Sequence, residues 1–339
     1  MEPASAEGLR AGGGRVICRT ATIATVLFGA IGISVSTAQT FPARPIKLIV
    51  ATAPGGPPDI TGRILAQKLS EGMDQQVIVE NRAGAGGTIG SEEVAKAKPD
   101  GYTLLFGTTG TLAGAPNLYS NLGYDPVRSF APISLVSIAP LLIVIHPSVP
   151  AASLREFIEF AKARPGRINA GSAGNGTPPH IAVEMFKTLA GIDLVHIPYK
   201  GSGAGVLGLI AGDVQVYIEQ FNGALQQAVR AGKLRALAIA SSKRHALLPN
   251  VPTAAEAGLP GYEVSGWTGV LAPRGTAPEV IRQLNGEVLK ALATKEVRDT
   301  LANQGIAPAG STPQQFSAFI AEEIAKWSRA IKASGAKVD

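Results

Sequence analysis

Three loops rich in small residues carry the groups best suited to holding a small polar molecule. They are Ala53–Asp59, Gly107–Thr111 and Gly171–His180, and each follows a run typical of a β-strand. In open α/β sheets, backbone amides and helix N-termini gather at the carboxyl ends of the strands, and ligands bind there. We therefore predict one shared binding site. Its predicted contacts are Pro54, Gly55, Gly56, Asp59, Thr108, Thr109, Ser172, Ala173, Gly174, Asn175, Gly176, Thr177 and His180.

The loop Gly171–His180 is suited to binding a carboxylate. Its amides and the hydroxyls of Ser172 and Thr177 can donate hydrogen bonds to an anion without a positively charged side chain. A tight glycine turn that ends in a helix cap has the same residues, so a purely structural role stays open. The loop also contains the one pairing that could support catalysis, in which His180 activates Ser172 or Thr177.

Signatures of common enzyme classes are missing from the sequence. There is no G-x-S-x-G nucleophile elbow and no G-x-x-x-x-G-K-[ST] phosphate loop. The segment Gly84–Gly90 resembles a dinucleotide fingerprint, but Ile89 stands at its third glycine position. The four histidines are too far apart in sequence to form a metal-ligand pair on one helix. We expect no catalytic residues, no metal and no cofactor.

The segments that position these loops alternate between strand and helix patterns. Ile46–Val50 and Tyr102–Phe106 are typical of buried strands, and Ile64, Leu65 and Leu69 share one face of a helix between them. Strands separated by helices predict βαβ units and a parallel sheet.

Two further strands are predicted to connect two parts of the protein. Leu141–Ile145 precedes a helix capped by Ser153, and Gly269–Ala272 precedes a helix capped by Thr276. One strand enters the middle of the chain and the other leaves it, as a two-lobed protein requires. A C-terminal helix capped by Thr312 is expected to pack on the first lobe.

The first residues of the chain have the pattern of a secretory signal peptide. Three arginines precede the uncharged apolar stretch Ala21–Val35, and small residues follow it up to Ala38. The stretch is shorter than the ~20 residues that a membrane-spanning helix needs, which favours a signal peptide over an anchor. We predict that residues 1–38 are a signal peptide, cut after Ala38, and that the protein is periplasmic.

Composition narrows the possible partners. The chain has 339 residues and a net charge of +6, and its Lys and Arg residues are scattered, so nucleic acid is not an expected partner. Cys18 is the single cysteine and lies within the predicted signal peptide, which excludes disulfides and thiolate chemistry from the remainder. Nothing in the sequence indicates an oligomer, so a monomer is expected.

Several short motifs occur together along the whole chain after residue 38. They are Ala53–Gly56 with Asp59, Val79–Arg82 with Gly84–Gly87, Pro99–Leu105, Tyr124–Pro126, Ser172–Thr177, His196–Gly201, Pro252 and Thr253 with Glu256–Gly258, and Gly310–Pro313. In this combination and order, the chain resembles the tripartite tricarboxylate transporter substrate-binding proteins, also called Bug-type receptors.

The resemblance implies an α/β fold like that of type II periplasmic binding proteins, with two α/β lobes joined by two crossover strands. The implied first lobe combines residues 41–142 and 262–339, and the second is residues 143–261. The resemblance also implies that hydrogen bonds and bridging waters hold a ligand carboxylate between the first-lobe loops and Ser172–Thr177. Known ligands of the family include di- and tricarboxylates, acidic amino acids and aromatic acids, so the family does not fix the ligand.

The chain departs from the family pattern at two places. Pro57 and Pro58 replace small or hydroxylated residues, and they remove two possible backbone donors. Glu219 and Gln220 stand where the family commonly has an aspartate followed by an asparagine. The resemblance implies that Glu219 contacts the ligand and selects for an amine or a hydroxyl, although a solvated surface position stays open.

The expected function is that of a periplasmic solute-binding receptor. It captures a small carboxylate-containing organic acid by lobe closure and delivers it to the membrane permease of a tripartite tricarboxylate-type transporter. Two other functions stay open. One is a sensor of the same fold that signals to a membrane sensor kinase, and the other is a periplasmic enzyme that uses His180 with Ser172 or Thr177.

Overall fold

The alternation of strands and helices is confirmed in the structure, a computed structural model that describes residues 41–334. The predicted signal peptide and its cleavage site lie outside the described residues. The strands are β1 (Ile46–Val50), β2 (Val77–Asn81), β3 (Thr103–Thr108), β4 (Phe130–Ile145), β5 (Asn169–Ser172), β6 (Val195–Pro198), β7 (Val216–Gln220), β8 (Arg235–Ile239), β9 (Ser265–Pro273) and β10 (Ala307–Pro308).

Helices of very different length lie between these strands. They are α1 (Pro57–Met73), the 3-10 turn η1 (Ala85–Gly87), α2 (Thr88–Ala95), the π-helical turn η2 (Gly110–Gly114), α3 (Ala115–Leu118), α4 (Leu154–Lys162), α5 (Pro178–Ala190), α6 (Ser202–Ala211), α7 (Gly223–Arg230), α8 (Pro278–Ala293), α9 (Lys295–Asn303) and α10 (Pro313–Ser334). Among residues 41–334, none of the helices is both long enough and apolar enough to cross a membrane.

The strands form two groups that share β4. Hydrogen bonds join them in the order β2-β1-β3-β9-β4-β7-β5-β6, and β8 and β10 also pair with β4. In the first strand group, β1 is parallel to both β2 and β3, while β9 is antiparallel to both β3 and β4. In the second strand group, β5 is parallel to β6 and β7, and β4 pairs with β7 and β8 in the antiparallel sense. The predicted parallel units are therefore confirmed in both groups.

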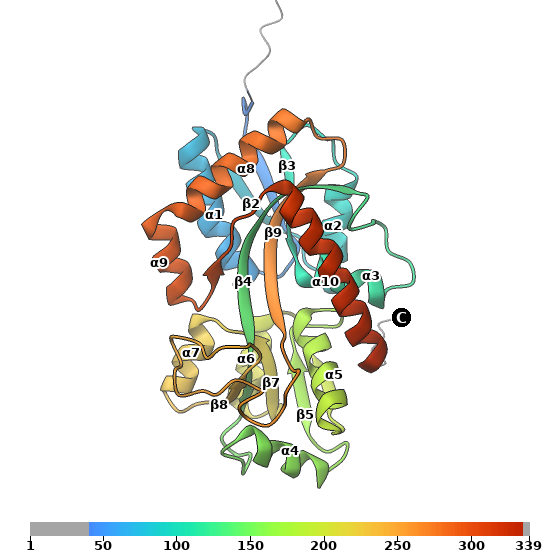
Figure 1. Cartoon of the computed structure of the whole chain (residues 1–339), viewed down its shortest axis with the longest axis vertical. Coiled ribbons are helices and arrows are strands. Elements are labelled where there is room, and N and C mark those ends of the chain that lie inside the picture. The colour runs from blue at the N-terminus through green and yellow to red at the C-terminus, as the bar shows by residue number, and fades with distance from the viewer. Residues whose placement is uncertain (1–40, 335–339) are drawn as a thin grey trace, which may run out of the picture. The chain divides into compact units, whose positions relative to one another are not determined.

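β4 runs through both groups beside β9 (Figure 1). Its first part, up to Pro140, pairs with β9, and its last five residues, Leu141–Ile145, pair with β7. The sequence indicated these last five residues as the whole strand. The earlier part was missed because Pro132 and Pro140 interrupt the strand pattern. The structure accommodates Pro132 at a register shift just before Ser134.

Helices cover both faces of the first strand group, which explains why its central strands β1 and β3 are mostly apolar. On one face Leu48 packs in a cluster with Leu65 of α1 and Leu284 of α8. On the other face Ile49 belongs to a cluster that includes residues of α2, η2, α3 and α10, among them Phe316. Alternate residues of β1 thus point into separate cores.

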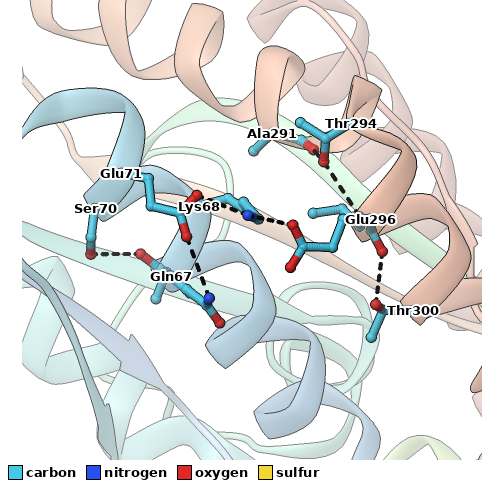
Figure 2. Close-up of polar contacts among 10 residues, drawn as sticks. Gln67, Lys68, Ser70, Glu71, Ala291, Thr294, Glu296 and Thr300 are labelled. Atoms are coloured by element: carbon cyan, nitrogen blue, oxygen red, sulfur yellow. Dashed lines mark hydrogen bonds and ion pairs between the residues drawn. The ribbon is translucent and has the colours of Figure 1, made fainter.

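A salt-bridged lysine joins the two helices on the first face. The ammonium of Lys68 on α1 lies 2.8 Å from Glu71 on the same helix and 2.6 Å from Glu296 on α9 (Figure 2). Within α9, the Thr300 hydroxyl donates to the Glu296 carbonyl at 2.7 Å. The ion pair between Lys68 and Glu296 links α9 to α1, the helix that begins beside the predicted site.

One of the predicted helix caps is wrong. Ser153 caps α4 as expected, since its hydroxyl accepts the amide of Glu156 at 3.2 Å. The residue before α8 is Ala277, and its side chain makes no capping bond. Thr276 instead donates its hydroxyl hydrogen to the carbonyl of Pro273 at 2.8 Å. The helix starts one residue later than predicted because Thr276 closes the turn that leaves β9.

The C-terminal helix α10 packs against both strand groups and their helices. It contacts η2, α3 and β4 and also α5 of the second group (Figure 1). Its apolar stripe is buried from Phe316 to Ile331. The expectation that α10 packs on the first lobe was therefore incomplete, because the helix also reaches the second.

The predicted N-terminal cap of α10 is present in the structure, and its contribution to stability can be tested. The amide of Gln315 donates to the Thr312 hydroxyl at 3.2 Å, and the amide of Thr312 donates to the Gln315 side chain at 2.9 Å. We expect Thr312→Ala to lower the free energy of unfolding by about 1 kcal/mol. Urea denaturation measures this, with the exposed Ser317→Ala on the same helix as the control. Equal stabilities of the two variants would contradict the assignment.

Candidate functional site

A cavity of about 690 Å³ lies between the two strand groups. The ends of β1, β3, β5 and β7 and the first turns of α1, α5 and α6 surround it, as the rule for open α/β sheets predicts. Its lining residues are Ala51, Thr52, Ala53, Gly56, Pro58, Ala83–Gly87, Thr108, Thr109, Tyr119, Ala173, Gly174, Asn175, Thr177, Pro178, Pro179, Tyr199–Ser202, Glu219, Gln220 and Trp267.

The three predicted loops meet at this cavity, but they contribute unequally. The predicted residues that line it are Gly56, Thr108, Thr109, Ala173, Gly174, Asn175, Thr177 and Glu219. The predicted residues outside the lining are Pro54, Gly55, Asp59, Ser172, Gly176 and His180. Most of the second set have side chains or amides that hold the loops in shape.

Asp59 is a structural residue of the first loop. Its buried carboxylate accepts the amide of Gly55 at 2.9 Å and the side-chain amide of Asn81 at 2.9 Å, and it lies 3.0 Å from the Arg63 guanidinium. Burial opposes ionisation of Asp59, but these three donors outweigh it and lower the pKa. The carboxylate therefore ties β2 to the loop that precedes α1.

Ser172 and His180 lie behind the third loop. The Ser172 hydroxyl is 2.6 Å from Nε2 of His196, and Nδ1 of His180 accepts the amide of Gly176 at 3.2 Å. The two imidazole rings stack with their centroids 4.2 Å apart. Burial lowers the pKa of each ring to about 4, so both are neutral at pH 7. The two imidazoles therefore hold the loop Gly171–His180 in shape without lining the cavity.

Several groups that the sequence offered as ligand donors are bonded within the loops. The amide of Gly174 donates to the Ser172 hydroxyl at 3.1 Å, and the Thr177 hydroxyl donates to the Gly174 carbonyl at 2.6 Å. Gly55 and Gly176 donate to Asp59 and His180. The expectation that these amides and hydroxyls are free was wrong, because short polar loops satisfy their own backbone groups.

The helix termini around the cavity differ in their capacity to donate. α1 begins with Pro57 and Pro58, and α5 begins with Pro178 and Pro179, so each lacks two of the amides that a helix N-terminus normally presents. α6 follows Gly201 and has no proline in its first turn. The donor-rich end of the cavity is therefore at α6.

Lys200 stands beside this donor-rich end. It lies directly before the Gly201 cap of α6, and it is exposed. Among the residues that line the cavity, Lys200 and Glu219 are the two with ionisable acidic or basic side chains. They give the cavity one cationic and one acidic position.

Glu219 is buried in the cavity wall at the end of β7, with 1% of its surface exposed. Oε1 accepts the amide of Gln220 at 2.8 Å, whereas Oε2 has no hydrogen-bond partner among the described residues. Burial raises the pKa of Glu219 to about 7, and the nearby Ser202 hydroxyl and Gln220 amide offset this only in part. The side chain is therefore not solvated, and it is protonated to a large extent near neutral pH.

Trp267 forms part of the wall and is held by a carboxylate on α10. Its indole N–H donates to Oε2 of Glu323 at 2.8 Å, and the indole of Trp327 donates to the same atom at 3.0 Å. Glu323 is 7% exposed, and Lys326 lies 3.3 Å from its other oxygen. The C-terminal helix thus orients a residue of the cavity wall.

More than two thirds of the lining residues were not among the contacts predicted from the sequence. Tyr199–Gly201 and Gly84–Gly87 belong to the motifs that carried the family resemblance, and that signal could have placed them at the site. Tyr119 and Trp267 carry no such signal. They reach the cavity because α3 and β9 fold against it from distant parts of the chain.

The fold and the site define the class of protein. Two strand groups linked by the long strands β4 and β9, with a cavity between their loops, are the architecture of periplasmic binding proteins. An adipate-bound protein of R. palustris matches with a TM-score of 0.84 and 35% identity over 88% of this chain and 100% of that one. MatC from Rhodopseudomonas palustris, with bound malate, matches with a TM-score of 0.81 and 34% identity over 86% and 100%.

The family follows from the sequence matches. The model of the tripartite tricarboxylate transporter family receptor matches residues 61–336, and the chain belongs to this family. Protein BugT of Bordetella pertussis is 41% identical over 323 residues, which cover 93% of this chain and 99% of BugT. The predicted family and fold class are confirmed.

The buried acid predicts a pH-dependent stability difference. The pKa of Glu219 is raised on folding from its ordinary value of 4.5 to about 7, so its ionisation destabilises the folded protein as pH rises through this range. Relative to the parent, Glu219→Gln should gain about 3 kcal/mol of unfolding free energy between pH 4.5 and pH 8. Urea denaturation across this range measures the gain.

Three histidines also affect stability at acidic pH, with the opposite sign. Burial lowers the pKa of His180, His196 and His245, which costs stability as pH falls below 6.5 in both proteins, so the difference between variant and parent removes their contribution. Glu322→Gln, at an exposed carboxyl of α10, is the matched control. A difference between Glu219→Gln and the parent that does not vary with pH contradicts a buried, neutral Glu219.

Proposed function

We propose that this protein is a periplasmic receptor that binds a small carboxylate-containing organic acid in the cavity and delivers it to the membrane permease of a tripartite tricarboxylate-type transporter. In this proposal, residues 1–38 direct export and are removed after Ala38. Family membership supports the transport role. The adipate and malate complexes of two similar proteins support the class of ligand.

Buried polar atoms without a hydrogen-bond partner provide the main support for this proposal. Three buried side-chain atoms of the described residues have no hydrogen-bond partner: Thr52 Oγ1, Tyr217 OH and Glu219 Oε2. Thr52 and Glu219 line the cavity, whereas Tyr217 lies outside the lining, and its hydroxyl is close enough to the Glu219 carboxyl for burial and this carboxyl to raise its pKa. Buried polar groups are normally paired, so the two unpaired oxygens in the cavity lining favour a polar ligand that pairs with them.

The charges of the cavity suggest how an acid is oriented. A carboxylate end is placed near Lys200 and the first turn of α6, where the ammonium and the helix dipole both favour an anion. A hydroxyl or an amine of the ligand is placed near Glu219, whose Oε2 can accept a hydrogen bond. The loop Ser172–Thr177 lies beside this end, since the amide of Gly201 donates to the Ala173 carbonyl at 3.1 Å, and it faces the cavity through residues that include Ala173 and Asn175.

The two strand groups are proposed to be the lobes that move. One lobe is residues 41–142 with 262–339, and the other is residues 143–261. β4 and β9 connect them, so rotation about these strands opens and closes the cavity as in other hinged receptors.

We also propose that the protein is not an enzyme. The candidate base His180 accepts an amide through Nδ1 and is not the partner of Ser172, whose hydroxyl bonds to His196. Neither His180 nor Ser172 is part of the cavity lining. These contacts support a structural role for the histidines and a binding role for the site.

A thermal-shift screen of residues 39–339 tests the proposed ligand class. Binding to the folded state at a concentration one hundred times the dissociation constant adds about 2.7 kcal/mol of stability. We expect one or more acids, with malate and adipate included in the panel, to raise the melting temperature by at least about 3 °C at 1 mM. The corresponding amides and esters should have no effect. Stabilisation by the neutral compounds and by none of the acids would show that the proposed ligand class is wrong.

The proposed carboxylate position has its own test. Lys200→Met removes the cation of the cavity, and it should weaken binding of the acid found in the screen about tenfold, as measured by isothermal titration calorimetry. Lys233→Met makes the same change in net charge at an exposed residue outside the cavity, and it should bind like the parent. Equal affinities for both variants would place the carboxylate elsewhere.

A further inference from the structure

The two sides of the cavity meet at residues that have no side chain or a very small one. On one rim, a Cβ atom added to Gly86 would lie 3.1 Å from the Asn175 carbonyl oxygen and 3.4 Å from the carbonyl carbon of Gly176. On the other rim, a Cβ added to Gly201 would lie 3.0 Å from Cβ of Ala53. The first and second strand groups therefore lie within van der Waals distance of each other on both sides of the cavity, and we take this arrangement to be the closed one.

Two more glycines lie on this contact, beneath the first rim. A Cβ at Gly110 would meet Cδ of Pro178 at 3.0 Å and the carbonyl oxygen of Gly176 at 3.5 Å. A Cβ at Gly114 would meet Cδ1 of Ile181 at 2.9 Å. Both glycines belong to η2 on one side of the cavity, and their nearest neighbours belong to the start of α5 on the other side.

Neither glycine is required by its own backbone. Gly110 and Gly114 are not among the glycines with positive φ, and Gly114 has φ −78° and ψ −56°, which any residue adopts. Glycine in a helical turn also costs stability relative to alanine. The backbone of η2 therefore does not explain why Gly110 and Gly114 lack side chains, whereas the close approach of Pro178 and Ile181 does.

We propose that Gly110 and Gly114 set the ligand affinity of this receptor without contacting the ligand, because an added Cβ would crowd the Pro178 ring at the first position and the end of the Ile181 side chain at the second, and so would raise the free energy of the contact between the two strand groups. Neither residue lines the cavity. The inference rests on the proposed function, since it assumes that closure accompanies binding. An added methyl group here leaves the open state unaffected and raises the free energy of the closed state alone, so it lowers affinity by reducing the closed population.

Disulfide trapping measures closure without any ligand. A Cβ at Gly56, which has an ordinary φ of −82°, would lie 3.7 Å from the Ser202 hydroxyl on the other side of the cavity. Residues 39–339 contain no cysteine, so Gly56→Cys with Ser202→Cys supplies one pair that joins only in the closed state. The rate of disulfide formation under oxidised glutathione, followed by mass spectrometry, reports how often this state forms.

We expect Gly110→Ala to slow disulfide formation at least about tenfold in this background. Gly114→Ala should slow it by less, because Cδ1 of Ile181 is the free end of a flexible side chain, and Ile181→Val should restore the rate because it removes this atom. Gly286→Ala on α8 is the matched control, since a Cβ there meets nothing within 4 Å. The proposal is overturned if Gly110→Ala forms the disulfide at the same rate as the background without it. It is also overturned if the cysteine pair never forms the disulfide in that background.

Melting temperatures and binding separate this inference from the proposed function. Gly110→Ala without the cysteine pair should melt close to the parent and bind malate or adipate, whichever stabilises the parent, about tenfold more weakly. If acids bind but Gly110→Ala has the parental affinity, the glycine proposal fails and the receptor function stands. If disulfide formation responds to Gly110→Ala but no acid binds, the carboxylate function fails and the closure contact stands.

Discussion

The pairing of β4 with β9 is the constraint on which the rest of the structure depends. β4 is the strand that the two groups share, because it pairs with β9 at one end and with β7 and β8 at the other. Each group can build its own parallel unit and its own core, yet both present their loops to one cavity because the same strands position them. The structural role of Pro132 and Pro140 within β4 follows from this, since each lies where the pairing changes.

The site combines loops that are satisfied internally with a small number of groups that are not. Asp59, His180 and His196 use their hydrogen bonds to fix the loops, which leaves the walls small, apolar and close to one another. Polar capacity is concentrated at Lys200, at the first turn of α6 and at Glu219. A receptor that closes on its ligand needs this division, because a wall that rearranges would use binding energy to order itself.

The sequence predicted the fold well because apolar alternation and family motifs both depend on local patterns. It located the Ser172–Thr177 loop at the cavity, and it identified Glu219 as unusual. Prediction from the sequence was wrong mainly where a side chain's partner comes from a distant part of the chain. The partner of Ser172 is His196 on the neighbouring strand, Trp267 reaches the wall through a contact with α10, and Thr276 closes a turn in place of capping a helix. None of these pairings is visible in the spacing of residues along the chain.

If the cavity binds an organic acid, the wall residue Trp267 can report the binding directly. The chain has two tryptophans, so Trp327→Phe leaves Trp267 as the single indole. The measurement is a fluorescence titration of this variant with malate, adipate and the other acids of the panel, each beside its amide. We expect a saturable change in emission with an acid, at one molecule per chain, and no change with its amide. Equal responses to acid and amide, or none to any acid, would contradict this expectation.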